Sequence, residues 1–231
     1  MADRLVIRRA TLEDYEGVMD IGKIYEGRDY LPAMYDKHLK VFNCYVGEID
    51  GEIVAFNADR LVDAGATITT ASARVKEGYQ GRGILAAILK HVDDFYTDVK
   101  TVKYKAMTCD NINMQLNGEG IKRQFTQILE RQVNLEINGE VTDFKPQNIE
   151  SDQIKVQELT SEDLKAIFKS KDMCSKLFPG ERILPGWHPY RLLPENIPQM
   201  MDEFKFWGTK TLTLSTYTTL TVTENYSLGK S

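Results

Sequence analysis

The sequence predicts an α/β fold in which helices flank a mixed central sheet, with a small α+β lobe at its C-terminal end. Three observations support this fold class. Strand-like and helix-like runs alternate up to about residue 137, a hairpin signal lies at Asp50-Gly51, and a glycine-rich turn at residues 78–83 joins a strand to an amphipathic helix. This order predicts a sheet whose first half is largely antiparallel.

The first expected elements are a strand and two helices. Residues 5–11 start as a strand, and Thr11 followed by Asp14 resembles a capping box for a helix that continues to Ile24. Pro32 suits the first turn of a second short helix, because proline has no N–H group to lose there.

A hairpin, a strand and a longer helix follow. Two β-rich runs in residues 42–62 meet at Asp50-Gly51, a pair that accepts the positive φ values of a type I′ turn. A strand over residues 68–75 leads into the glycine turn. The helix predicted over residues 84–95 has an apolar stripe that should cover one face of the sheet, formed by Ile84, Leu85, Ile88, Leu89, Val92 and Phe95.

The remaining chain indicates a second, smaller part. We expect a strand at residues 101–109, a short helix or loop at 111–120 and strand material at 123–137. The polar, proline-containing residues 144–151 are the best linker candidate. The expected domains are therefore 1–143 and a C-terminal lobe at 152–231.

The lobe combines one helix, one irregular segment and one strand. Residues 159–170 read as a capped amphipathic helix, residues 177–198 carry five of the seven prolines, and residues 211–222 alternate like a strand. We expect too little apolar material for a separate core, so the lobe should dock on the first domain or on a second copy of the chain. A homodimer is thus one expected assembly.

Composition is that of an ordinary globular protein, with 42% hydrophobic and 27% charged residues. The net charge of −5 argues against nucleic acid as the main partner. No apolar run reaches the ~20 residues of a membrane span, so we expect a cytoplasmic protein with no membrane partner. We also expect no metal site, because the sequence scatters its possible ligands: Cys44, Cys109, Cys174, His38, His91 and His188.

The glycine turn suits a ligand that carries phosphate. Gly78, Gly81 and Gly83 let the backbone approach a bulky group, the next helix offers free N–H groups at its positive end, and Arg82 adds a permanent cation. The spacing fits neither the GxGxxG of dinucleotide folds nor the GxxxxGK[ST] of nucleotide-triphosphate loops. The plain alternative is a permissive turn before a helix.

The stretch "RVKEGYQGRGILAAIL" resembles the acetyl-coenzyme A motif of the Gcn5-related N-acetyltransferase (GNAT) superfamily, Q/R-x-x-G-x-G/A. The resemblance implies acetyl-coenzyme A as co-substrate and a strand that splays from its neighbour to admit pantetheine. It implies contacts from Ala73, Arg74 and Val75 to pantetheine, from the turn to pyrophosphate, and from Asn111 to coenzyme A. The turn residues implied are Gly78, Gln80, Gly81, Arg82, Gly83 and Ile84, with Gly78 replacing the usual glutamine or arginine.

A second stretch, "IYEGRDYLPAMYDKHL", is similar to the segment joining the first two helices of vertebrate histidine N-acetyltransferase and its relatives, and "LPGWHPYRLLPENIP" is similar to their C-terminal extension. Carboxylates in such a loop can attract and deprotonate an ammonium group, and tyrosine hydroxyls can orient it. The candidate catalytic residues are Glu26, Asp29 and Tyr30, and the candidate substrate contacts are Tyr25, Tyr30 and Tyr35. Packing and helix capping are the alternative roles of these side chains.

Two functions remain open. The first is an acetyl-coenzyme A-dependent N-acetyltransferase for a small-molecule amine, with the α-amino group of histidine or a related amino acid as candidate acceptor. The second is a noncatalytic acyl-coenzyme A-binding module with a partner-binding lobe. The second function gains weight because this chain lacks two groups that the resemblance implies for catalysis. Relatives have glutamate near the position of Ala71, and a proton-donating tyrosine is expected where this chain has Gly118. The enzyme is favoured, because many superfamily members work without one or both residues.

Overall fold

The computed structural model describes residues 5–22, 29–109, 111–128, 154–211 and 217–224. Contacts divide the chain into two compact units. The first comprises Met1–Cys109 and Trp187–Pro189, and the second comprises Asp110–Gly186 and Tyr190–Ser231. The linker and domain boundaries expected at 144–151 lie outside the described residues and remain a prediction.

The first unit is built on a five-stranded sheet with the strand order β1-β2-β3-β4-β5. Neighbouring strands are antiparallel from β1 to β4, and β5 runs parallel to β4. The mixed α/β fold and its largely antiparallel first half are therefore confirmed. The strands are β1 (Leu5–Arg9), β2 (Asn43–Ile49), β3 (Glu52–Val62), β4 (Thr67–Val75) and β5 (Tyr104–Met107).

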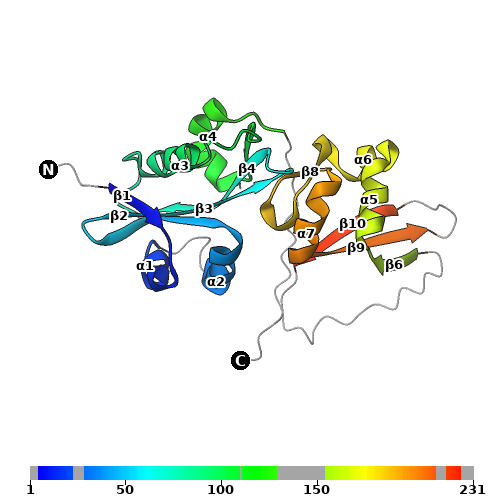
Figure 1. Ribbon diagram of the computed structural model, residues 1–231, viewed down its shortest axis with the longest axis horizontal. Coiled ribbons are helices and arrows are strands. Elements are labelled where there is room, and N and C mark those ends of the chain that lie inside the picture. Colours follow the sequence, from blue (N-terminus) through cyan, green and yellow to red (C-terminus); the bar gives the residue numbers. More distant parts are fainter. Residues whose placement is uncertain (1–4, 23–28, 110, 129–153, 212–216, 225–231) are drawn as a thin grey trace, which may run out of the picture. The chain divides into compact units, whose positions relative to one another are not determined.

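Helices cover both faces of this sheet (Figure 1). α1 (Tyr15–Met19) and α2 (Leu31–Val41) bury apolar side chains against one face, where Val46, Phe56 and Ala58 are completely buried. α3 (Ile84–Phe95) covers the other face with the predicted stripe, of which Ile84, Ile88 and Val92 are buried. The helix predicted to continue to Ile24 is shorter than expected. A 3₁₀ turn at Leu12–Asp14 precedes it, and α1 ends at Met19.

The hairpin prediction is confirmed between β2 and β3. Asp50 and Gly51 form its turn with φ values of 51° and 84°. Both angles lie in the left-handed region that a type I′ turn requires.

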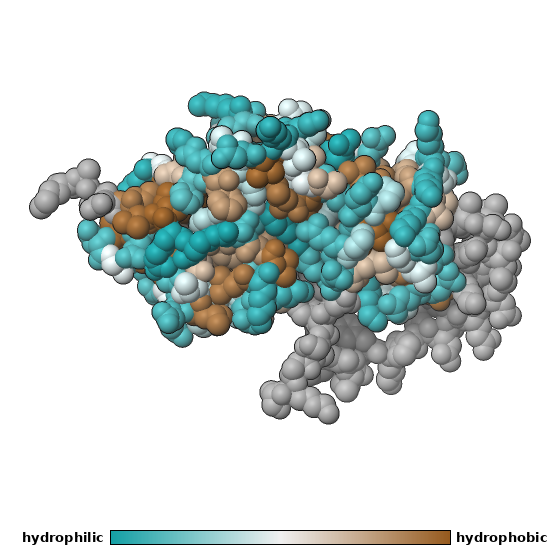
Figure 2. Space-filling model, viewed as in Figure 1, coloured by the Kyte–Doolittle hydropathy of each residue, from teal (hydrophilic) through white to brown (hydrophobic). Residues whose placement is uncertain are grey.

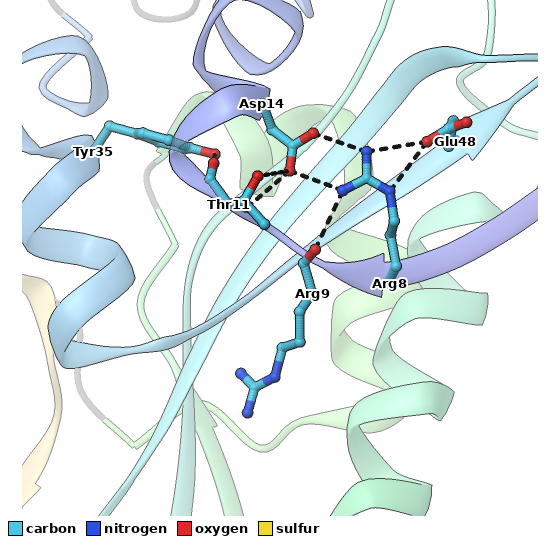
Figure 3. Close-up of polar contacts among 6 residues, drawn as sticks. All are labelled: Arg8, Arg9, Thr11, Asp14, Tyr35 and Glu48. Carbon is cyan, nitrogen blue, oxygen red and sulfur yellow. Dashed lines mark hydrogen bonds and ion pairs between the residues drawn. The ribbon is translucent and has the colours of Figure 1, made fainter.

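A polar network fixes α1 and α2 to the edge of the sheet (Figure 3). The guanidinium of Arg8 on β1 donates two 2.8 Å hydrogen bonds to the Asp14 carboxylate and a 3.1 Å bond to Glu48. The backbone N–H of Thr11 donates to the same Asp14 carboxylate at 2.8 Å. The pKa of Asp14 lies below its ordinary value, first because of the Arg8 hydrogen bonds. From α2, the Tyr35 hydroxyl donates to the Thr11 carbonyl at 2.8 Å.

The second unit contains a three-stranded antiparallel sheet, in the order β10-β9-β6, with helices packed on it. Leu164 and Ile167 of α5, Ile197 and Met200 of α7, and Phe206 of β9 have no exposed surface. The elements are α4 (Asn111–Gln124), β6 (Ile154–Glu158), α5 (Ser161–Lys169), α6 (Lys171–Leu177), β7 (Arg182–Ile183), β8 (Tyr190–Arg191), α7 (Ile197–Glu203), β9 (Phe204–Thr211) and β10 (Tyr217–Glu224).

Three expectations about this part need correction. The buried side chains above form a core, although the composition led us to expect too little apolar material for one. Residues 211–222 are not one strand, because β9 ends at Thr211 and β10 returns antiparallel from Tyr217. Arg123 and Gln124 belong to α4 rather than to a strand, since the helix runs on through a polar sequence that lacks a helix-breaking proline.

The visible surface carries several separate hydrophobic areas with hydrophilic side chains between them (Figure 2). Among the described residues, no helix has both the length and the apolar character needed to cross a membrane.

Candidate functional site

Strand β4 has an open edge over its second half. Its parallel pairing with β5 runs from Thr67, opposite Tyr104, to Thr70, opposite Met107, where β5 ends. β4 itself continues to Val75, and its opposite edge stays paired with β3 up to that residue. Within the described residues, no strand pairs with the β5-facing side of residues 71–75. A strand edge of this kind offers backbone groups to an extended ligand.

A β-bulge interrupts β4 at the start of this open edge. Ala71 pairs with Ala58 and Arg74 pairs with Phe56, so Ser72 and Ala73 together face Asn57. Ser72 has a φ of 55°, which costs a residue with a side chain about 1 kcal/mol or more. Such strain is typical of places where the backbone is shaped for a ligand.

The glycine turn lies between the open edge of β4 and α3. Gly78, Gly81 and Gly83 have φ values of 84°, 75° and 79°, all in the region that favours glycine. A Cβ atom at any of the three would meet no atom within 4 Å, so backbone conformation and not packing requires glycine here. Gly83 is the N-cap of α3 and has no side chain that could bond the first-turn N–H groups. The backbone N–H groups of the turn and the positive N-terminal end of α3 can therefore bind a phosphate.

Side chains next to the turn stabilise its shape. The Tyr79 hydroxyl donates to Glu52 at 2.8 Å, and the Arg82 guanidinium lies 5.0 Å from the centre of the Tyr79 ring. Lys76 forms ion pairs with Glu52 at 2.7 Å and with Asp20 at 2.5 Å. The Gln80 amide donates to the Val75 carbonyl at 3.1 Å. The turn is thus anchored to β3 and β4 while its glycines stay uncovered.

Asp29 and Tyr30, from the loop before α2, both contact the bulged part of β4. The Asp29 carboxylate accepts two hydrogen bonds from Arg74, at 2.5 and 3.2 Å, and its Oδ1 also accepts one from the N–H of Leu31 at 3.0 Å. The Tyr30 hydroxyl lies 2.8 Å from the Ser72 hydroxyl. The structure therefore brings two of the predicted acceptor residues to the strand that was predicted to hold the cofactor.

Other predicted residues have different positions. Tyr35 is only 2% exposed and its hydroxyl donates to the Thr11 carbonyl, contacts that favour the alternative packing role. Glu26 and Tyr25 lie outside the described residues. Asn111 is the first residue of α4, in the second unit.

Two of the histidines that lie far apart in the sequence meet at Phe42. His38 stacks on the Phe42 ring at 4.8 Å between ring centres, and His188 packs on the same ring at 5.1 Å. Burial, reinforced by the positive charges of Arg60 and Arg74, lowers the pKa of His38 to about 4. Burial also lowers the pKa of His188 well below its ordinary value. The contact between His38 and Phe42 could have been expected from their i, i+4 spacing. No signal in the sequence indicated that His188 would pack on the same ring.

The chain is similar to histidine N-acetyltransferases of fish. Residues 152–226 match the family model described as "Histidine N-acetyltransferase, C-terminal". The chain is 25% identical over 224 residues to histidine N-acetyltransferase of Oreochromis niloticus. The predicted resemblance to histidine N-acetyltransferases is confirmed. The histidine N-acetyltransferase of Scomber australasicus is 22% identical over 220 residues. Each alignment covers 86% of this chain, and the chain spans 63% of the length of each relative.

Solved structures similar to this chain also include acetyltransferases. An aminoglycoside N-acetyltransferase in complex with CoA has a TM-score of 0.47 and 13% identity, over 60% of this chain and 98% of that one. The ribosomal-protein-alanine N-acetyltransferase of Brucella melitensis biovar Abortus 2308 has a TM-score of 0.45 and 14% identity, over 59% of this chain and all of that one.

Proposed function

We propose that this protein is an acetyl-coenzyme A-dependent N-acetyltransferase for the amine of a small molecule, with the α-amino group of histidine or a related amino acid as acceptor. The observation that carries the proposal is the convergence of three features on β4. An open edge and an uncovered glycine turn suit the cofactor. Asp29 and Tyr30, the described residues of the loop before α2 (the acceptor loop), reach the same strand. The similarity to histidine N-acetyltransferases supports the choice of acceptor.

The residues present fit coenzyme A. The N–H groups of Gly81 to Ile84 would bind the pyrophosphate, with Arg82 as a nearby cation. The backbone of Ala73 to Val75 would bind pantetheine along the open edge of β4. When bound, acetyl-coenzyme A supplies a thioester whose acetyl group an amine can accept.

Acetyl transfer to an amine requires one proton to leave the ammonium group and one to reach the departing thiolate. The hydroxyls of Tyr30 and Ser72 lie 2.8 Å apart, so each can hold a proton and donate it through the other. Asp29 is engaged by Arg74 and Leu31, and this fixes the position of Tyr30 next to it. We therefore give Tyr30 a proton-transfer role and Asp29 a positioning role.

A thiol-release assay tests this proposal. The purified chain is incubated with acetyl-coenzyme A and a panel of amino acids, polyamines and peptides, and acetylated products are identified by mass. Release of coenzyme A with an N-acetyl amino acid as product supports the enzyme. Calorimetric binding of acetyl-coenzyme A without any acetylated product would support the noncatalytic module, whose case rests on Ala71 and Gly118. Light scattering on the same preparation measures whether the chain forms the expected homodimer.

A further inference from the structure

Trp187 is an exposed aromatic residue with a strained backbone. It has 59% of its surface exposed, although tryptophan is usually well buried. Its φ is 69°, a left-handed conformation that is unfavourable for a residue with a large side chain. Strain and exposure together need a compensating role, because neither stabilises the fold.

Two contacts hold the backbone at Trp187 in this position. Trp187–Pro189 belongs to the first unit by its contacts. The Thr108 hydroxyl donates to the Trp187 carbonyl at 2.6 Å, and the next residue, His188, is 6% exposed and packs on Phe42. The backbone of Trp187 is therefore fixed while its indole ring remains available.

The anchoring point coincides with the place where β4 and β5 separate. Thr108 directly follows Met107, the last β5 residue paired with β4, and Met107 is opposite Thr70. Two residues beyond Thr70, Ser72 contacts Tyr30, which is itself 38% exposed. Trp187 is thus held beside the start of the open edge, where the acceptor must meet the acetyl group. Ligands commonly bind beyond the carboxyl ends of parallel strands.

Resting on the proposed function, we infer that the indole of Trp187 recognises the acceptor by stacking on its planar imidazole side chain. A fixed indole presents a flat apolar face with a negative quadrupole, which stacks on planar rings and attracts their cationic forms. An aliphatic amino acid gains less from such a face. Trp187 therefore contributes to the preference among amino acids, while the backbone turn binds the cofactor without it.

Fluorescence provides a test that does not depend on turnover. The chain has two tryptophans, so Trp207→Phe leaves Trp187 as the only indole reporter. In the presence of coenzyme A, we expect L-histidine to change the Trp187 emission in a saturable way and L-alanine to leave it unchanged. An equal response to both amino acids, or none to either, would overturn the inference.

Steady-state kinetics completes the test. Trp187→Ala should raise the KM for histidine about 3- to 10-fold, and Trp187→Phe should recover part of the loss, because phenylalanine retains a stacking face. The affinity for coenzyme A should stay within about twofold in both variants. Phe95→Ala, which removes another exposed aromatic at the end of α3, is the control and should leave the KM unchanged.

The two proposals fail in different ways. A wild-type chain that acetylates histidine while Trp187→Ala keeps its KM contradicts the role of Trp187 alone. A histidine-dependent change in Trp187 emission without any acetyl transfer contradicts the proposed function and leaves the recognition role supported.

Discussion

The guanidinium of Arg74 on β4 and the carboxylate of Asp29 before α2 form a bidentate ion pair, with N···O distances of 2.5 and 3.2 Å. Their side chains are only 3% and 12% exposed. Removing one member of a buried pair leaves the other charge without compensation, which commonly costs about 3–5 kcal/mol. This pair therefore couples the stability of the first unit to the position of the acceptor loop.

Asp29→Asn is expected to lower the free energy of unfolding by about 3 kcal/mol and to raise the KM for the amine, because Arg74 loses its countercharge and Tyr30 loses its fixed position. Cofactor affinity should be nearly unchanged. Urea unfolding and steady-state kinetics measure the two effects. The control is Asp36→Asn, which breaks an exposed pair with Lys40 and should cost no more than about 0.5 kcal/mol. Equal effects of the two substitutions would contradict the special role of the buried pair.

Tyr30→Phe should lower kcat about 100-fold and leave the coenzyme A affinity intact, because it removes a proton-carrying hydroxyl and keeps the ring. Ser72→Ala should act in the same direction, and the double variant should lose little more than Tyr30→Phe alone, since one hydrogen bond joins the two hydroxyls. Tyr15→Phe, whose ring packs on Tyr35, is the matched control. Unchanged kcat in both hydroxyl variants would exclude the proton-transfer role.

Gly83→Asp should remove most of the affinity for coenzyme A, because it places a side chain and a negative charge where phosphate must approach. Gly51→Asp is a close control. Both glycines have positive φ values, 79° and 84°, and open space where a Cβ atom would lie, but Gly51 belongs to the β2–β3 hairpin. Calorimetry should therefore detect a large loss for the first variant only. Similar affinities of the two variants would contradict the assignment of the pyrophosphate site.

The buried His38 should make stability dependent on pH. Its folded-state pKa is about 4, below the ordinary 6.5, so protonation favours the unfolded chain. The contribution of neutral His38 is complete above about pH 6.5 and is lost progressively as the pH falls toward 4, by at most ~3 kcal/mol. Unfolding curves of the wild type and of His38→Phe over this range provide the measurement. The slope should be shallower in His38→Phe but should not vanish, because the pKa of buried His188 is also lowered. His91→Phe, on α3, is the control, and equal slopes in the wild type and in His38→Phe would contradict the contribution of His38.

Much of the fold followed from local sequence signals. The Asp50-Gly51 turn, the stripe from Ile84 to Phe95 and the capped helix predicted in residues 159–170 are short-range patterns, and the structure contains all three. The cap of that helix is a capping box formed by Thr160 and Asp163. The strand predicted at residues 211–222 was wrong because alternating residues do not reveal where a hairpin turns back. The core of the second unit was underestimated, because it combines side chains from segments that each look marginal alone.

The sequence by itself determined the mixed α/β order and the glycine turn, because φ requirements and hydrophobic periodicity act within a few neighbouring residues. Only the tertiary structure decided which side chains meet. Asp29 and Arg74 are 45 residues apart, and Thr108 and Trp187 are 79 apart. Such contacts depend on strand register and on how helices pack across the sheet, and a one-residue shift in register would turn Arg74 to the opposite face. The composition of the candidate site is therefore a property of the fold rather than of any one motif.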